Sequence, residues 1–189
     1  GLSIYDLEKK LVAIIMTFGG KQLNHFLLKF LEDKMNTEEM RDILEVILIK
    51  TAIGIRDIHK ENIMHRDIKG VNMFVNEMEP GVYVLKIGDF GITRDIIELQ
   101  SEFDTPEFQD VLATRVKMTN IGTNFYMASE ISSQDIYTEK VDCFAWGKMA
   151  LRCHKHCGFL KKEYKDIIHS VTEKEMSKNF IVAIKHALA

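Results

Sequence analysis

A stretch of 25 residues, "NTEEMRDILEVILIKTAIGIRDIHK" (36–60), constrains the fold of this chain more than any other segment. Asn36 followed by Glu39 fits a capping box, in which two side chains bond the free N–H groups at the start of a helix. The residues that recur at helical spacing are Met40, Ile43, Leu44, Ile47 and Thr51. The sequence therefore predicts a long, largely buried helix that leads directly into the polar segment "IMHRDIKGVN" (63–72).

Composition limits the classes of protein that this chain can belong to. Its 189 residues, 46% hydrophobic and 28% charged, suffice for one sizeable core. The net charge of −3 comes from interspersed acids and bases, so we expect neither a nucleic-acid nor a membrane partner. No apolar run is long enough to cross a bilayer, and Cys143, Cys153 and Cys157 are a poor basis for disulfides. We therefore expect a single domain in the reducing cytoplasm.

Shorter patterns complete the predicted layout, which is α+β and mainly helical with small β-hairpins. Strands are predicted at "KLVAIIM" (10–16), "VNMFVN" (71–76) and "VYVLKIG" (82–88), the last two joined by the loop "EMEPG" (77–81). Helices are predicted at 21–32, 139–153, 161–171 and 173–189, the last two as surface helices. Residues 95 to about 120 lack periodicity and predict a long loop, of the kind that is often functional.

Four motifs follow one another in a fixed order. They are "HRDIKGVN" (65–72), "DFG" (89–91), "GTNFYMASE" (122–130) and "DCFAWG" (142–147). Each alone is weak evidence, but together, after a long helix, they resemble the C-terminal lobe of eukaryotic protein kinases. The resemblance runs from about residue 5 to the end. It implies a partial kinase domain over residues 1–189, truncated at both ends, with the hinge strand but without the N-terminal lobe.

The resemblance assigns the chemistry of phosphoryl transfer to four polar residues. It implies that Asp67 accepts or orients the proton of the substrate hydroxyl, and that Lys69 places its ammonium against the transferring phosphate. Asn72 and Asp89 offer the hard oxygen ligands that Mg²⁺ prefers while it stays bound to nucleotide phosphates. The expected reaction moves the γ-phosphate of ATP to a Ser or Thr hydroxyl of a protein substrate.

The same resemblance places the nucleotide base. Ile14, Ile15 and Met16 fall in the hinge, with Ile14 near the gatekeeper position, and Phe74 would lie under the adenine ring. The run "VAII" resembles the strand motif "VAIK", but Ile15 stands where the lysine is needed. About fifty residues separate this run from His65, which fits the hinge instead.

Regulation is expected at the segment between the second and third motifs. In kinases with arginine at the place of Arg66, that side chain pairs with a phosphorylated residue of the activation loop. Thr114 and Thr119 are the preferred sites here, and an upstream kinase is the implied partner. Lys69 and the Gly122–Thr123 pair resemble serine/threonine kinases, in which Thr123 could bridge Asp67 and Lys69.

Other motif positions are expected to be structural. His65 and Phe90 would stack in a hydrophobic spine, with Gly91 beside them, and Asp142 would hold the backbone of the catalytic loop. Glu130 would normally pair with an arginine far beyond the helix at 139–153, but no arginine follows Arg152. Ser129 also replaces the usual proline.

Two alternatives stay open. The sequence holds no G-x-G-x-x-G loop and no strand lysine, so we expect residues 1–189 alone to catalyse little or nothing, and a pseudokinase-like scaffold is the rival interpretation. The run "CHKHC" (153–157) offers thiol and imidazole groups that suit Zn²⁺, although no second ligand pair follows at finger-like spacing. A helix end with buried cysteines is the simpler interpretation.

Overall fold

The computed structural model describes residues 2–5, 11–15, 17–32, 37–96, 125–132, 138–159 and 178–188. It is a mixture of helices and small antiparallel sheets, as the sequence predicts. The predicted helix at 161–171 and almost all of the predicted loop at 95–120 lie outside these residues. No helix in the described ranges is long and apolar enough to cross a membrane.

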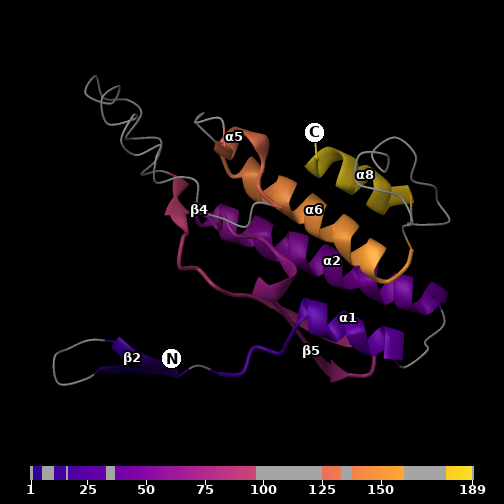
Figure 1. Ribbon diagram of the computed structural model, residues 1–189, viewed down its shortest axis with the longest axis horizontal. Helices are drawn as coiled ribbons and strands as arrows, with labels where there is room; N and C mark the ends of the chain where they lie inside the picture. Colours follow the sequence, from indigo (N-terminus) through magenta and orange to yellow (C-terminus); the bar gives the residue numbers. More distant parts are fainter. Residues whose placement is uncertain are drawn as a thin grey trace.

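The predicted central helix is confirmed as α2 (Thr37–Lys60). It packs against α6 (Lys140–His156) and against the hairpin of β5 and β6, while α1 (Leu23–Glu32) packs against β5 and α6. Figure 1 shows α2 with α6 above it and α1 below it. Its inward side chains are fully or almost fully buried: Met40, Leu44, Ile47, Leu48 and Ile55. Burial of such a face supplies most of the stability of a helix in a protein.

Thr51 explains why a polar residue continues the apolar row of α2. Its hydroxyl donates to the Leu48 carbonyl (2.6 Å) and accepts the indole N–H of Trp146 from α6 (2.8 Å). Thr51 is completely buried, so both of its hydrogen-bonding functions are satisfied inside the core. The contact fixes α6 against α2.

The predicted hairpin is confirmed as β5 (Met73–Glu79) and β6 (Val82–Ile87), which pair antiparallel. β3 (Lys21–Gln22) pairs with the other edge of β5. The predicted loop at 77–81 is too long, because the strand continues to Glu79 and only Pro80 and Gly81 turn. Gly81 has a φ of 79°, a left-handed conformation in which glycine meets no steric penalty.

The predicted strand at 10–16 is confirmed as β2 (Leu11–Ile15). It pairs antiparallel with β1 (Leu2–Tyr5), which the sequence pattern did not reveal. Two further strands, β4 (Ile63–Met64) and β7 (Arg94–Asp95), pair with each other and flank the first two motifs. The strands that were not predicted, β1, β4 and β7, have only two to four residues each, so they carry little periodicity.

The C-terminal elements pack on α6. The predicted helix at 139–153 is confirmed and ends slightly later, at His156. The predicted helix at 173–189 appears as α8 (Lys178–Ala187), but it is not only a surface helix: Ile184 is buried and Leu188 lies against Gly147. A short helix, α5 (Ser129–Ser132), precedes α6.

Candidate active site

The segment between β4 and β5 carries the first motif, and Asp142 of α6 holds its backbone. Asp142 Oδ2 accepts the N–H of His65 and Oδ1 accepts the N–H of Arg66, both at 2.7 Å. The Asp142 side chain is 1% exposed, so these bonds are shielded from water. The aspartate at the start of the fourth motif thus meets the first motif, as the resemblance implied.

His59, near the end of α2, joins the same carboxylate. Its Nε2 lies 2.9 Å from Asp142 Oδ2. Because a carboxylate only accepts hydrogen bonds, this ring nitrogen carries the proton. No sequence pattern identifies His59, because its partner lies 83 positions away and its place on a helix carries no signal of its own.

The completely buried His65 connects the first motif to the second. Its Nδ1 accepts the N–H of Asp67 (3.2 Å), so Nδ1 is unprotonated and Nε2–H donates to the Gly88 carbonyl (3.0 Å). The rings of His65 and Phe90 meet edge to face, with centroids 5.0 Å apart and planes at 60°, and do not lie parallel. Position and tautomer of this ring are therefore set by the residues on either side of it.

Asp67 is the centre of a compact polar group. Its Oδ2 lies 2.6 Å from Lys69 Nζ and accepts a hydrogen bond from Asn72 Nδ2 at 3.0 Å. Asn72 Nδ2 also donates to the Asp67 carbonyl (2.9 Å), which fixes the asparagine amide. The Asp67 side chain is 10% exposed and that of Lys69 is 21% exposed, so the carboxylate sits in a protected place that still reaches solvent.

Asn72 belongs to this group, and Asp89 follows Gly88, whose backbone bonds Asn72. The Gly88 N–H donates to the Asn72 carbonyl (2.9 Å), which ties the second motif to the turn Gly70–Asn72. The Asn72 side chain uses its NH₂ group on Asp67, which leaves its amide oxygen to face away, and Asp89 is exposed with a left-handed φ of 63°. One amide oxygen and one carboxylate fit Mg²⁺ that keeps water and phosphate as its other ligands. No cluster of three or more metal-binding side chains occurs in the described ranges.

Phe74 lies between two glycines. A Cβ atom at Gly88 would stand 2.8 Å from Phe74 Cε2, and one at Gly19 would stand 3.4 Å from Phe74 Cγ. The ring thus packs against bare backbone on both sides. Ile14 and Ile15 lie in β2, and their side chains, like the whole of Met16, lie outside the described part of the chain.

Arg66 is buried and has a left-handed φ of 69°. Its Nη1 donates to the Ile92 carbonyl (3.4 Å), just after the second motif. Beside it, β4 and β7 bring residues 63–64 next to residues 94–95. Thr114, Thr119 and Thr123 lie outside the described residues, as does the side chain of Glu130, while Gly91 lies in an exposed turn.

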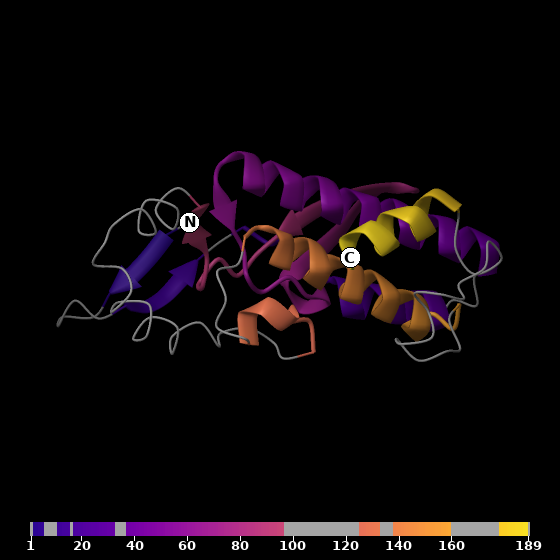
Figure 2. The same ribbon diagram turned by 90° about the horizontal axis from the view of Figure 1, so that it is seen from above.

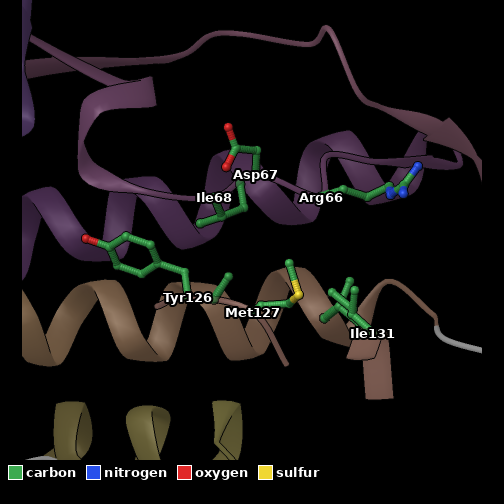
Figure 3. Close-up of a pocket in the computed structure, with 8 residues that line it drawn as sticks. Arg66, Asp67, Ile68, Tyr126, Met127 and Ile131 are labelled. Atoms are coloured by element: carbon green, nitrogen blue, oxygen red, sulfur yellow. The ribbon is translucent and has the colours of Figure 1, made fainter. Parts of the chain in front are cut away.

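A narrow hollow separates the first motif from the third (Figure 3). It is lined by Arg66, Asp67, Ile68, Tyr126, Met127, Ile131, Val141 and Ala145. Its free volume of about 10 Å³ is about that of one water molecule, so it is a packing defect and not a ligand site. The hollow shows that the third motif lies directly against the catalytic loop implied by the resemblance.

The contacts of the run 153–157 favour a helix end over the alternative zinc site. Cys153 and Cys157 are buried in α6 and after it, and burial raises the pKa of Cys153 to about 12 and that of Cys157 to about 11. Metal ligation requires thiolates, which these environments disfavour. The buried His154 donates from Nδ1 to the Ala150 carbonyl (2.9 Å), and His156 is exposed. These contacts agree with the simpler interpretation of a helix end.

Comparison with known proteins settles the family. A family model described as "Protein kinase domain" matches residues 2–187. The chain belongs to the protein kinase family. This confirms the resemblance drawn from the four motifs.

Individual kinases match over parts of the chain. The eukaryotic translation initiation factor 2-alpha kinase pek-1 of Caenorhabditis elegans is 30% identical over 145 residues, covering 70% of this chain and 13% of that protein. The serine/threonine-protein kinase SKM1 of Saccharomyces cerevisiae is 32% identical over 105 residues, covering 56% and 13%. The serine/threonine-protein kinase pakH of Dictyostelium discoideum is 32% identical over 108 residues, covering 57% and 17%. The chain spans less than a fifth of the length of each of these kinases.

Proposed function

We propose that this kinase chain carries the acceptor and metal half of a protein serine/threonine kinase active site. In the complete protein it would take part in transfer of the ATP γ-phosphate to a Ser or Thr hydroxyl of a protein substrate. The observation that supports this most is the contact of Asp67 with both Lys69 Nζ (2.6 Å) and Asn72 Nδ2 (3.0 Å) in a protected group. A carboxylate, an ammonium and an amide oxygen are the groups that this reaction needs.

Each residue has a separate task in the proposed mechanism. The Asp67 carboxylate orients the acceptor hydroxyl and takes its proton, while two neighbouring donors hold the carboxylate in place. Lys69 then stabilises negative charge on the phosphoryl oxygens. Asn72 and Asp89 would hold Mg²⁺, which supplies charge neutralisation when bound, and Ile14, Ile15, Met16 and Phe74 would contact the adenine.

Arg66 is the proposed point of regulation. Its guanidinium contacts the Ile92 carbonyl, close to the start of the segment that contains Thr114, Thr119 and Thr123. A phosphate on Thr114 or Thr119, added by an upstream kinase, would supply an anion for this guanidinium. The three free thiols support a reducing, cytoplasmic setting.

The test compares the full-length protein with its Asp67→Asn variant. Asparagine keeps the size of the side chain but cannot take the proton, so we expect transfer to a generic basic protein substrate to fall about 10²- to 10⁴-fold. Radioactive phosphate incorporation measures the rate. Glu79→Gln removes an exposed carboxylate from the tip of the β5–β6 hairpin and should leave the rate unchanged.

Equal transfer by the Asp67→Asn variant and the parent would refute the catalytic assignment and favour the scaffold interpretation. Circular dichroism spectra that match between the two proteins exclude unfolding as the cause of a lost rate. For residues 1–189 alone we propose little or no transfer, because this sequence holds no glycine-rich loop to clamp the nucleotide.

A further inference from the structure

A single row of exposed side chains runs along α2 on the side opposite the core. Its residues follow one another at alternating steps of three and four: Glu39, Asp42, Val46, Ile49, Ile53, Arg56 and Lys60. The three β-branched residues at the middle are 42–49% exposed. Figure 2 shows α2 along the upper border of the molecule, with α6 and α8 on its other side. This spacing is the one that places side chains on the seam between two packed helices.

The charges on this face divide between the two ends of α2. The N-terminal end carries Glu38, Glu39 and Asp42 against Arg41, and the first turn is therefore acidic. The C-terminal end carries Arg56 and Lys60, and Asp57 contacts both of them (2.8 Å and 3.4 Å). The N-terminal end thus has three acidic side chains and one basic one, and the C-terminal end has two basic side chains and one acidic one, with Val46, Ile49 and Ile53 between them.

We propose that α2 packs against α2 of a second copy of this chain, antiparallel, around a two-fold axis close to Ile49. In that arrangement the acidic end of each helix meets the basic end of its partner, and the β-branched residues meet each other at the axis. The face is therefore complementary to itself, which is the property that a two-fold symmetric contact requires. A face of one charge sign would instead select a different partner.

The surface beside the row enlarges the possible contact. A hollow of about 500 Å³ lies between α2 and β6. Ile53 and Asp57 form part of its wall on α2, Val84 and Ile87 line it on β6, and Phe90 also lines it. Val82 and Val84 are 49% and 40% exposed, so the apolar area extends from the helix onto the strand. Side chains from the row of a second copy could occupy this space.

Charge reversal tests the arrangement. In the variant E39K/D42K both ends of the row are basic, and in R56E/K60E both ends are acidic. Sedimentation equilibrium of the 189-residue chain should show a reversible dimer, and each variant should dissociate at least ~10-fold more readily. An equimolar mixture of the two variants should associate again, because the basic row of one fits the acidic row of the other. The variant with all four changes should also recover self-association.

The control variant K140E/K185E reverses two exposed lysines outside the row, on α6 and α8, and should dimerise like the parent. Circular dichroism confirms that every variant is folded before its mass is measured. A parent chain that stays monomeric at ~100 μM, or two variants that fail to associate when mixed, would overturn the proposal. If the parent chain stays monomeric, this face of α2 would contact another protein or solvent.

Discussion

At the scale of single residues, the position of the backbone at His65 and Arg66 depends on one buried carboxylate. Asp142 accepts hydrogen bonds from two backbone N–H groups and from His59. Without it, both N–H groups would be buried with no acceptor in reach, and each such group costs about 1–3 kcal/mol. The three bonds are not equivalent, because His59 is a side chain that can be removed without leaving a backbone group unpaired.

We therefore predict different losses for two substitutions. Asp142→Ala should lower the free energy of unfolding by about 2–5 kcal/mol, whereas His59→Ala should lower it by about 1 kcal/mol. Asp142→Asn keeps one acceptor oxygen, so its loss of unfolding free energy should lie between the losses of the other two variants. Urea unfolding followed by circular dichroism measures all three. Equal losses for Asp142→Ala and His59→Ala would show that the backbone bonds contribute little.

The sequence predicted some contacts of this site and not others. The contact of Asp142 with residues 65–66 followed from the order of the motifs, because a motif set that repeats across a family carries its long-range contacts with it. His59 was missed, since no pattern along α2 distinguishes it from its neighbours. The direct contact of Lys69 with Asp67 was not predicted either, and the expected bridge through Thr123 lies outside the described residues.

At the scale of elements, a side chain added at a glycine can cost stability in two ways, through its backbone conformation and through a steric clash. Two glycines with positive φ distinguish these costs. Gly81, at the hairpin turn, has a φ of 79° and open space around it. Gly20, before β3, has a φ of 122°, and a Cβ there would stand 2.5 Å from the Val75 carbonyl oxygen. The second position combines a conformational cost with a clash against the backbone of β5.

Gly81→Ala should therefore cost about 1 kcal/mol of stability, the usual penalty of a left-handed conformation. Gly20→Ala should cost at least ~2 kcal/mol more, because β3 must shift away from β5. Thermal unfolding of both variants gives the difference. If the two variants lose equal stability, then β3 can move away from β5 without loss of stability, and Gly20 does not pack tightly against Val75.

The length of an element decided whether the sequence revealed it. The helices α1, α2 and α6 and the strands β2, β5 and β6 are long enough for their periodicity to predict them. β4 and β7 are two residues each, and they pair across a gap of about thirty residues. Such strands form because tertiary contacts hold them, so local sequence carries no sign of them.

At the scale of the whole molecule, buried thiols make stability depend on pH in the alkaline range. Burial raises the pKa of Cys153 to about 12 and that of Cys157 to about 11, from an ordinary value of 9.0. Above pH 9 the unfolded chain loses these protons while the folded chain keeps them. Because the folded state then binds more protons, stability is complete below pH 9 and falls as pH rises toward 11 and 12.

We predict that the urea midpoint falls between pH 9 and pH 11. The variant C153A/C157A, compared with its own midpoint at pH 8, should show a shallower fall. It should not become flat, because burial also raises the pKa of Tyr83 and Tyr126 and acts in the same direction. An equally steep fall in the variant would mean that the two thiols do not control this dependence.

The backbone of Asp89 shows what the proposed active site demands of the fold. Its φ of 63° is a conformation that glycine adopts freely and that an aspartate adopts only with strain. The side chain is exposed, so burial does not repay this strain. A chain optimised for folding alone would place glycine at position 89. In the proposed function this carboxylate is a ligand of Mg²⁺, which is a reason for an aspartate to stand where the backbone prefers glycine.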